Sequence, residues 1–152
     1  MRQIVEGGLD DARVVCLLQT HWIQARAQTA AGSAHALDLD GLRDPQLRFW
    51  SLWDVGAVLA IGALKQLSSD HAEVKSMHTD AAARGRGIGG EMLRHIIGTA
   101  RDSGFRRLSL ETGSWDYFAP ARAFYRKHGF VDCPPFVGYV DDPNSVFMTL
   151  VL

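Results

Sequence analysis

Four glycines and two arginines alternate over residues 84–90, in the stretch RGRGIGG, directly before an apolar pattern of helical spacing. Glycine has no side chain and tolerates positive φ, so a ligand can approach the bare backbone there. The first N–H groups of a helix lack intrahelical partners and lie at the positive end of its dipole, which favours phosphate oxygens. Arg84 and Arg86 add positive charge. The stretch therefore predicts a phosphate-binding turn between a strand and a helix.

The patterns on either side of this turn predict a mixed α/β (α+β) fold. Asp10 and Asp11 are candidate N-caps for the first helix, and Gly104 and Gly129 are candidate stop signals for the later ones. Val55 and Gly56 separate two apolar runs that favour a β-hairpin. Strands are expected at 2–7, 47–54, 57–67, 72–79, 105–111 and 145–152, with helices at 12–28, 88–103 and 120–128 and one short helix within 29–45.

Composition sets the class of protein and the compartment. With 152 residues, 47% of them hydrophobic, we expect a single domain over residues 1–152. Sixteen basic and seventeen acidic side chains nearly cancel, so the overall charge favours neither a nucleic-acid nor a membrane partner. The two distant cysteines, Cys16 and Cys133, are typical of a reducing compartment, and no signal-peptide or membrane-spanning pattern occurs. We therefore expect a cytoplasmic protein.

Two other phosphate-binding motifs compete for the glycine turn. A P-loop requires lysine and a hydroxyl residue after its last glycine, but Glu91 and Met92 follow here. A dinucleotide fingerprint fits better, since Gly85, Gly87 and Gly90 spell G-x-G-x-x-G and Glu111 lies at a suitable distance for a ribose-binding acid. However, several residues separate the strand from the first glycine, and about sixty residues after the turn are too few for a doubly wound sheet. A dinucleotide-dependent oxidoreductase remains an alternative.

Two motifs together resemble the GNAT superfamily of N-acetyltransferases. Arg84, Gly87 and Gly89 fit the Arg/Gln-x-x-Gly-x-Gly/Ala pattern of its acetyl-CoA loop, and ARAFYRKHGF at 121–130 is similar to its A-x-x-x-Y-x-x-x-G-F signature. The resemblance covers residues 71–130 and extends to a bacterial subgroup through HALDLDGLRDP, EVKSMH, LSLETGS and SVFM. It implies a strongly twisted mixed sheet of about six to seven strands, splayed between the fourth and fifth, and flanked by about four helices.

The resemblance also implies that acetyl-CoA occupies the opening of the sheet. Its pyrophosphate would bind the glycine turn, and its pantetheine arm would pair like an added strand with the backbone of Met77 and His78. The small side chain of Ala121 would leave room for this arm. The asparagine that many relatives place before the tyrosine is absent, because Asp116, Phe118 and Pro120 stand in that segment. The predicted cofactor-binding residues are Met77, His78, Arg84, Gly85, Arg86, Gly87, Ile88, Gly89, Gly90, Ala121 and Tyr125.

Acetyl transfer to an amine needs a base and an acid. An alkyl ammonium has a pKa of about 10.4, so a proton must leave before the nitrogen attacks the thioester. Glu73, eleven residues before Arg84, is a candidate base, directly or through water, and Glu111 is a second one. Tyr125 in the signature is the candidate acid for the departing thiolate. The backbone N–H of Met77 or His78 is the expected oxyanion donor.

The acceptor is expected to be a primary amine of a small molecule or a peptide. Position alone suggests that Asp38, Trp115, Tyr139 and Asp142 contact it, because they lie in or beside the loops that would flank its entrance. A metal site is not expected: alternation would place His71 and Glu73 on one strand face and His78 on the other. A homodimer is a family expectation. A CoA-binding module without turnover is a further alternative to an enzyme.

Overall fold

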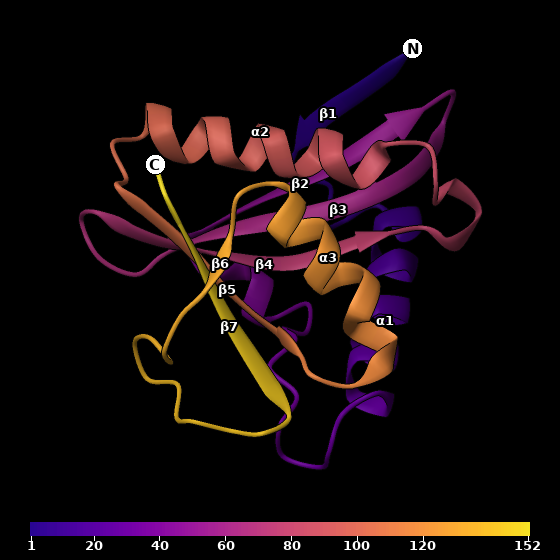
Figure 1. Cartoon of the computed structure of the whole chain (residues 1–152). Helices are drawn as coiled ribbons and strands as arrows, with labels where there is room; N and C mark the ends of the chain where they lie inside the picture. The colour runs from indigo at the N-terminus through magenta and orange to yellow at the C-terminus, as the bar shows by residue number, and fades with distance from the viewer.

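The computed structural model describes residues 1–152 and contains one seven-stranded sheet in the order β1-β2-β3-β4-β5-β7-β6 (Figure 1). Every neighbouring pair is antiparallel except β4 and β5, which are parallel. The strands are β1 Arg2–Glu6, β2 Leu47–Asp54, β3 Ala57–Gln66, β4 His71–Thr79, β5 Arg107–Gly113, β6 Val131–Asp132 and β7 Ser145–Val151. The α-helices are α1 Ala12–Ala27, α2 Ile88–Asp102 and α3 Ala119–Lys127, and the 3-10 helices are η1 Gly41–Arg43, η2 Ala81–Ala83 and η3 Asp116–Phe118.

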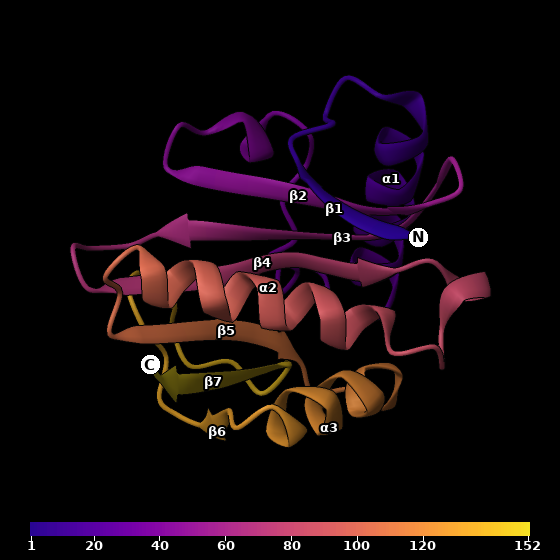
Figure 2. The same cartoon turned by 90° about the horizontal axis from the view of Figure 1, so that it is seen from above.

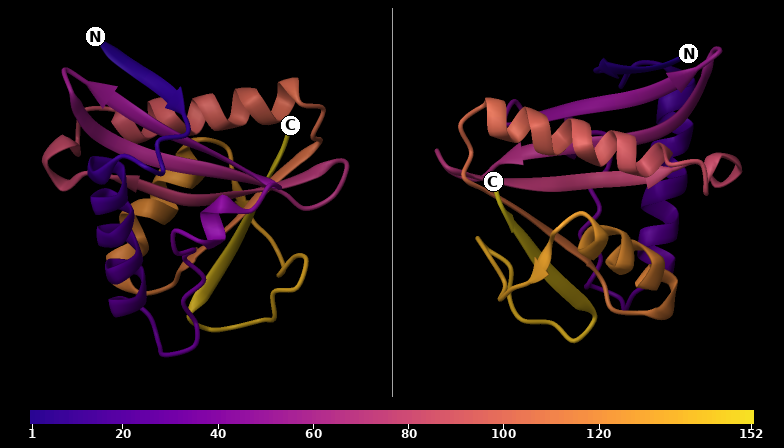
Figure 3. Two further views of the ribbon diagram at one scale, coloured as in Figure 1. Left: turned by 180° about the vertical axis from the view of Figure 1, so that it is seen from behind. Right: turned by 45° about the horizontal axis from the view of Figure 1, so that its top comes forward.

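The sheet opens between its fourth and fifth strands, as expected. Although β4 and β5 have nine and seven residues, their ladder joins only His71, Ala72 and Glu73 to Arg107, Leu108 and Ser109. Beyond these pairs the two strands diverge, and β5 and β7 cross away from β4 in Figures 1 and 3. The second halves of both strands therefore have backbone edges that face an opening.

Helices cover both faces of the sheet. Figure 3 shows α1 on one face and α2 on the other, and Figure 2 shows α2 running along β4 and β5 with α3 beside β7. A larger core cluster joins α2 and α3 to the sheet, while a smaller one lies under α1. The apolar face predicted for α2 is fully buried: Ile88, Met92, Leu93, Ile96, Ile97 and Ala100 are each at most 7% exposed.

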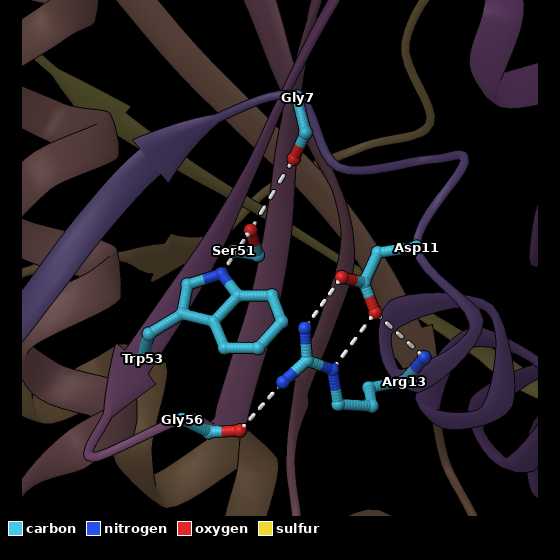
Figure 4. A network of polar contacts seen from close by, with 6 residues as sticks. All are labelled: Gly7, Asp11, Arg13, Ser51, Trp53 and Gly56. Carbon is cyan, nitrogen blue, oxygen red and sulfur yellow. Dashed lines mark hydrogen bonds and ion pairs between the residues drawn. The ribbon is translucent and has the colours of Figure 1, made fainter.

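The start of α1 is tied to the β2–β3 hairpin by a polar network (Figure 4). Asp11 caps the helix, accepting from the backbone N–H of Arg13 at 2.9 Å. The Arg13 guanidinium donates to the Asp11 carboxylate and to the Gly56 carbonyl at 2.8 Å. Of the two predicted caps, Asp11 holds this position, whereas Asp10 pairs with Arg43 at 2.9 Å. This network fixes one end of the helix that borders the opening of the sheet.

Three details differ from the expected pattern. The number of α-helices is three rather than about four, because the short helix expected within 29–45 is the single 3-10 turn η1. The two-residue strand β6 was not expected, because too few residues alternate for a pattern. The hairpin turn is confirmed: Val55 and Gly56 have φ of 47° and 77°, the positive values of a type I′ turn.

Candidate active site

The glycine turn presents an open backbone at the N-terminus of α2. Gly85 and Gly87 have φ of 79° and 76°, and a Cβ on either would meet nothing within 4 Å. Gly87 is the N-cap and has no side-chain cap, so the first amides of α2 have no partner from a capping side chain. Ile88, 1% exposed, anchors the turn in the core. A phosphate group fits here, because both space and unpaired donors are present.

A cleft of about 500 Å³ leads from this turn into the opening of the sheet. Its walls come from the end of β4, the glycine turn and α3. A Cβ at Gly89 would lie 3.2 Å from Thr79 Oγ1, so glycine keeps this wall thin. The residues that line the cleft are His21, Ala25, Met77, His78, Thr79, Ala83, Arg84, Gly85, Gly87, Ile88, Gly89, Gly90, Tyr117, Phe118, Pro120, Ala121, Phe124 and Tyr125. All the predicted cofactor-binding residues except Arg86 line this cleft.

A β-bulge in β4 shapes the middle of the opening. Ile61 pairs with His78 and Ala63 pairs with Lys75, so the two residues Ser76 and Met77 oppose one residue of β3. Ser76 has the unusual φ of 56°. The extra residue of a bulge is left outside the regular ladder, which frees backbone groups for another partner. The bulge also reverses the alternation downstream of it.

This reversal corrects the prediction for His78. Since His78 pairs with Ile61 and Lys75 with Ala63, and since Ile61 and Ala63 share a face, His78 lies on the same face as Lys75. Simple alternation placed it on the opposite face because the bulge was not visible in the sequence. No group of three or more His, Cys, Asp or Glu side chains is arranged to hold a metal ion.

A smaller pocket of about 130 Å³ continues from the cleft along the opening. The two cavities share His21, Ala25, Met77, Phe118, Ala121 and Tyr125, which therefore form a junction between them. The smaller pocket is also lined by Thr29, Ser33, Ala34, His35, Ala36, Glu73, Val74, Lys75, Ser76, Glu111, Thr112 and Gly113. The two candidate bases and the candidate acid thus line one pocket.

Glu73 is a buried carboxylate with strong partners. Its side chain is 4% exposed, and Oε2 accepts a hydrogen bond of 2.6 Å from the Tyr139 hydroxyl. Lys75 Nζ lies 3.5 Å from the same oxygen, and it donates to Tyr139 at 3.1 Å and to the His35 carbonyl at 3.2 Å. These contacts occupy Oε2, one of the two carboxylate oxygens of Glu73.

Glu111 lies on the other arm of the opening in a different environment. Burial raises its pKa from 4.5 to about 7, with a further increase from the charge of Glu73. Near neutral pH the ionised and protonated forms are therefore both populated. A carboxylate of this kind is suited to accept a proton and later release it.

Tyr125 occupies the junction of the two cavities. Its side chain is buried, and burial together with the nearby charge of Glu111 raises its pKa above the ordinary value. The hydroxyl is therefore fully protonated at neutral pH and can donate a proton. Ala121, one turn earlier on α3, lines the same junction, as the spacing predicted.

A histidine pair lies beside the junction, and the sequence did not reveal it: His21 lines both cavities, whereas His78 lines the larger cleft only. His21 Nδ1 on α1 and His78 Nδ1 on β4 lie 3.2 Å apart, so one ring donates and the other accepts. Burial lowers the pKa of each to about 4, and the like charges of Lys75 and Arg84 contribute. Both rings are therefore neutral at pH 7. The amphipathic pattern of residues 12–28 gave no signal that His21 would reach the site.

Of the four side chains predicted to contact the acceptor, only Tyr139 contacts residues that line the smaller pocket through hydrogen bonds to charged groups. The carboxylate of Asp38 accepts from the Gly41 N–H at 2.9 Å, and Trp115 Nε1 donates to Asn144 Oδ1 at 3.0 Å. Asp142 accepts from the backbone N–H of Asn144 at 2.9 Å. None of these three lines the smaller pocket, and Tyr139 reaches it only by its contacts with Glu73 and Lys75. The loop after α1 does border the pocket, but through residues 29–36.

Residues 16–130 match the sequence model of the acetyltransferase (GNAT) family. The chain belongs to the GNAT family. It is 45% identical over 141 residues to the uncharacterized N-acetyltransferase YsnE of Bacillus subtilis, with 93% of each chain covered. It is 43% identical to the uncharacterized N-acetyltransferase YedL of Escherichia coli over 139 residues, covering 91% of this chain and 87% of that protein. The sheet also excludes the dinucleotide interpretation. A doubly wound fold needs a mostly parallel sheet, whereas only β4 and β5 are parallel here.

Solved structures agree with this assignment. An acyl-CoA N-acyltransferase structure from Klebsiella pneumoniae has a TM-score of 0.82 and 27% identity, covering 100% of this chain and 98% of that one. A GNAT acetyltransferase of Elizabethkingia anophelis with acetyl-CoA bound has a TM-score of 0.73 at 15% identity, covering 99% and 98%, and so shares the fold. This GNAT protein is therefore an N-acetyltransferase, and acetyl-CoA is its cosubstrate. None of its helices is both long and apolar enough to cross a membrane.

Proposed function

We propose that this enzyme transfers an acetyl group from acetyl-CoA in the larger cleft to a primary amine in the smaller pocket, by direct attack in a ternary complex. The observation that supports this arrangement is the junction, where Met77, Ala121 and Tyr125 line both cavities. A thioester at the inner end of the cleft is then within reach of a nitrogen at the inner end of the pocket. No covalent enzyme intermediate is needed, because the two cavities are continuous.

The larger cleft would hold acetyl-CoA through main-chain groups. The amides at Gly87, Ile88 and Gly89 bind the pyrophosphate, and Arg84 and Arg86 balance its charge at the rim. Ser76 and Met77, at the bulge, provide backbone groups outside the regular ladder for the pantetheine arm. A backbone N–H of Met77 or His78 is the proposed donor to the thioester oxygen.

We propose Glu111 as the general base and assign Glu73 a positioning role. The base must be able to hold a proton near neutral pH, and the pKa of Glu111, at about 7, meets this requirement. Glu73 Oε2 already accepts from Tyr139 and lies 3.5 Å from Lys75, so neighbouring side chains occupy this oxygen before a substrate binds. The negative charge of Glu73 instead attracts the cationic amine and orders the wall of the pocket.

Tyr125 is the proposed general acid. The amine nitrogen forms a bond to the acetyl carbon, the bond from that carbon to sulfur breaks, and the sulfur takes a proton from the tyrosine hydroxyl. The nitrogen loses one proton to Glu111 before attack and a second as the amide forms. One of these protons returns to Tyr125 and the other leaves to solvent, so the reaction balances as amide, CoA thiol and one proton.

Two relatives carry names that mention an acceptor. An IAA acetyltransferase of Azospirillum brasilense is 42% identical over 119 residues, covering 78% of this chain and 76% of that protein. An amino-acid acetyltransferase of Mycobacterium tuberculosis is 32% identical over 77 residues, which is 51% of this chain and 40% of that one. We propose a small molecule as the acceptor, because the pocket beyond the junction is only about 130 Å³.

The decisive experiment measures cosubstrate binding and turnover separately. Calorimetry should detect acetyl-CoA binding, and a panel of small amines should release free CoA thiol with formation of acetylated amine. Tyr125→Phe should lower kcat by roughly 100-fold with little change in the Kd for acetyl-CoA. Tyr117→Phe is the matched control, since Tyr117 also lines the cleft but its hydroxyl donates to Gln24 Oε1 at 2.7 Å.

Two outcomes would contradict the proposal. Binding of acetyl-CoA without acetylation of any amine would favour the silent CoA-binding module. Equal losses of kcat in Tyr125→Phe and Tyr117→Phe would remove Tyr125 as the acid, even though the fold and the cleft would stand.

A further inference from the structure

We infer that the acceptor is a compact aliphatic primary amine that carries no carboxylate, an inference that rests on the proposed function. The charges of the smaller pocket, the contacts of its lysine and its small apolar walls support this inference. They separate this substrate class from the α-amino acids, which present an amine and a carboxylate on one carbon.

The charged groups of the pocket favour a cation and oppose an anion. Two carboxylates, Glu73 and Glu111, line it, while Lys75 is the one lysine or arginine among its lining residues. The two histidines that line it, His21 and His35, are buried enough for desolvation to lower the pKa of each, so they are neutral at pH 7. A substrate carboxylate would therefore enter a pocket with an excess of negative charge.

Lys75 is not free to bind a substrate carboxylate. Its ammonium has three N–H donors, and three acceptors surround it: the His35 carbonyl, the Tyr139 hydroxyl and the Glu73 carboxylate, at 3.2, 3.1 and 3.5 Å. Its side chain is 10% exposed. A carboxylate could gain this lysine only by displacing Glu73, which would then be buried without its cation. The Lys75–Glu73 ion pair therefore leaves the pocket without a free cation that could bind a substrate carboxylate.

The remaining walls suit a short aliphatic chain with neutral polar groups. Ala25, Ala34, Ala36 and Ala121 give the pocket small apolar surfaces, which suit a short aliphatic chain. The Ser76 hydroxyl lines the pocket, is buried with its residue 8% exposed, and has no hydrogen-bond partner. The Thr29 hydroxyl is also buried without a partner there. These hydroxyls can accept from the amine or pair with a substrate hydroxyl.

Matched pairs of acceptors test the inference directly. Alaninol and alanine differ in whether a hydroxymethyl or a carboxylate stands beside the amine, and ethanolamine and glycine form a second pair. With acetyl-CoA saturating, we expect kcat/KM for each amino alcohol to exceed that for its amino acid by at least about 100-fold, given charge repulsion at this depth of burial.

A charge variant links this preference to the pocket. Glu73→Gln keeps the size of the side chain and removes one negative charge, so the ratio of alaninol to alanine turnover should fall by at least about tenfold. Glu91→Gln, a change of the same kind on the outer face of α2 where Glu91 pairs with Arg2, is the matched control and should leave the ratio as it is. If Glu73→Gln fails to fold, the ratios of the unmodified enzyme decide alone.

Failure of this inference can be distinguished from failure of the proposed function. If alanine and glycine are acetylated as well as or better than their amino alcohols, the inference is wrong while the proposed function stands. If acetyl-CoA binds and no amine of the panel is acetylated, the proposed function itself fails and the inference falls with it. A ratio that does not change in Glu73→Gln would also overturn the inference, because the preference would not come from the charges of this pocket.

Discussion

The two cavities that meet at Tyr125 are built in different ways. The larger cleft takes its walls from the end of β4, the glycine turn and α3, and its proposed phosphate contacts come from one contiguous segment, residues 84–90, whose glycines expose backbone amides. The smaller pocket takes side chains from α1, the loop 29–36, β4, β5, η3 and α3. On the proposed function, backbone amides of one short segment recognise the diphosphate, whereas side chains from six separate segments recognise the acceptor.

The electrostatics of the two cavities also differ. Burial raises the pKa values of Glu111, Tyr125 and Tyr139, which lie in or beside the smaller pocket. Burial lowers the pKa values of His21, at the junction, and of His78, beside it in the larger cleft. Proton transfer is required where the amine reacts and not where the pyrophosphate binds. The perturbed groups are thus concentrated where the chemistry is expected.

The largest effect is expected from Glu111→Gln. Loss of a general base costs roughly 100-fold to 10,000-fold in rate, so kcat should fall by at least about 100-fold while the Kd for acetyl-CoA stays nearly constant. In the unmodified enzyme, kcat/KM should rise with pH through about 7 as Glu111 ionises, and the variant should lose this step. Steady-state kinetics from pH 5.5 to 9 measure both effects.

Glu73→Gln is the comparison for this base. Because Glu73 is already partnered by Tyr139 and Lys75, its loss should lower kcat by less than about tenfold with the amino alcohols. A larger loss in Glu73→Gln than in Glu111→Gln would exchange the two roles. That result would restore Glu73 as the base and would show that its ion pair with Lys75 opens when the acceptor binds.

The opposite pattern is expected in the larger cleft. Gly89→Leu places a side chain where even a Cβ lies 3.2 Å from Thr79 Oγ1, and the rest of it would enter the space proposed for the cosubstrate. We expect the Kd for acetyl-CoA to rise by about 30-fold, which corresponds to roughly 2 kcal/mol. Calorimetry measures it, and circular dichroism checks the fold. An unchanged Kd would place the cosubstrate elsewhere.

Features encoded by a short local pattern could be predicted from the sequence, whereas features that depend on packing between distant segments could not. Residues 84–90 and ARAFYRKHGF are local patterns, so the cosubstrate cleft and Tyr125 could be located without coordinates. The apolar spacing of α2 was read correctly because its buried face has a regular period. The bulge at Ser76 was not predictable, since it adds one residue to a strand without any glycine or proline to mark it.

The acceptor pocket was located only in part. The loop after α1 was predicted to border it, yet Asp38 was expected where His35 and Ala36 lie, because position in a loop does not show which side chain turns inward. Likewise, the partnership of His21 with His78 spans 57 residues and depends on the packing of α1 against the bulged end of β4. Contacts of this range come from tertiary structure alone.

The pH dependence of stability should show two opposing contributions from buried groups around the two cavities. His21 and His78 have folded pKa values of about 4, below the ordinary 6.5, so the unfolded chain binds more protons and stability falls as the pH falls below 6.5. Between pH 7 and pH 5 each histidine should cost about 2 kcal/mol. Glu111, with a pKa raised from 4.5 to about 7, acts in the opposite direction and contributes stability as the pH falls.

Variants separate these contributions in urea unfolding at pH 5 and pH 7. Glu111→Gln removes the compensating group, so its free energy of unfolding should fall on acidification by about 2 kcal/mol more than that of the unmodified protein. The double change His21→Gln with His78→Gln removes the opposing groups and should make the protein gain stability on acidification. Parallel pH profiles in all three proteins would mean that these groups titrate normally.

The smallest effect distinguishes two glycines of the same helix. Gly98 lies inside α2 with helical backbone and open space around it, so Gly98→Ala should stabilise the protein by about 1 kcal/mol and leave acetyl-CoA binding unchanged. Gly87 caps the helix with φ of 76°, so Gly87→Ala should destabilise it by about 1 kcal/mol and weaken acetyl-CoA binding. Urea unfolding and calorimetry measure both. Equal effects of the two changes would mean that the turn does not depend on its left-handed backbone, because only that conformation makes glycine necessary at position 87.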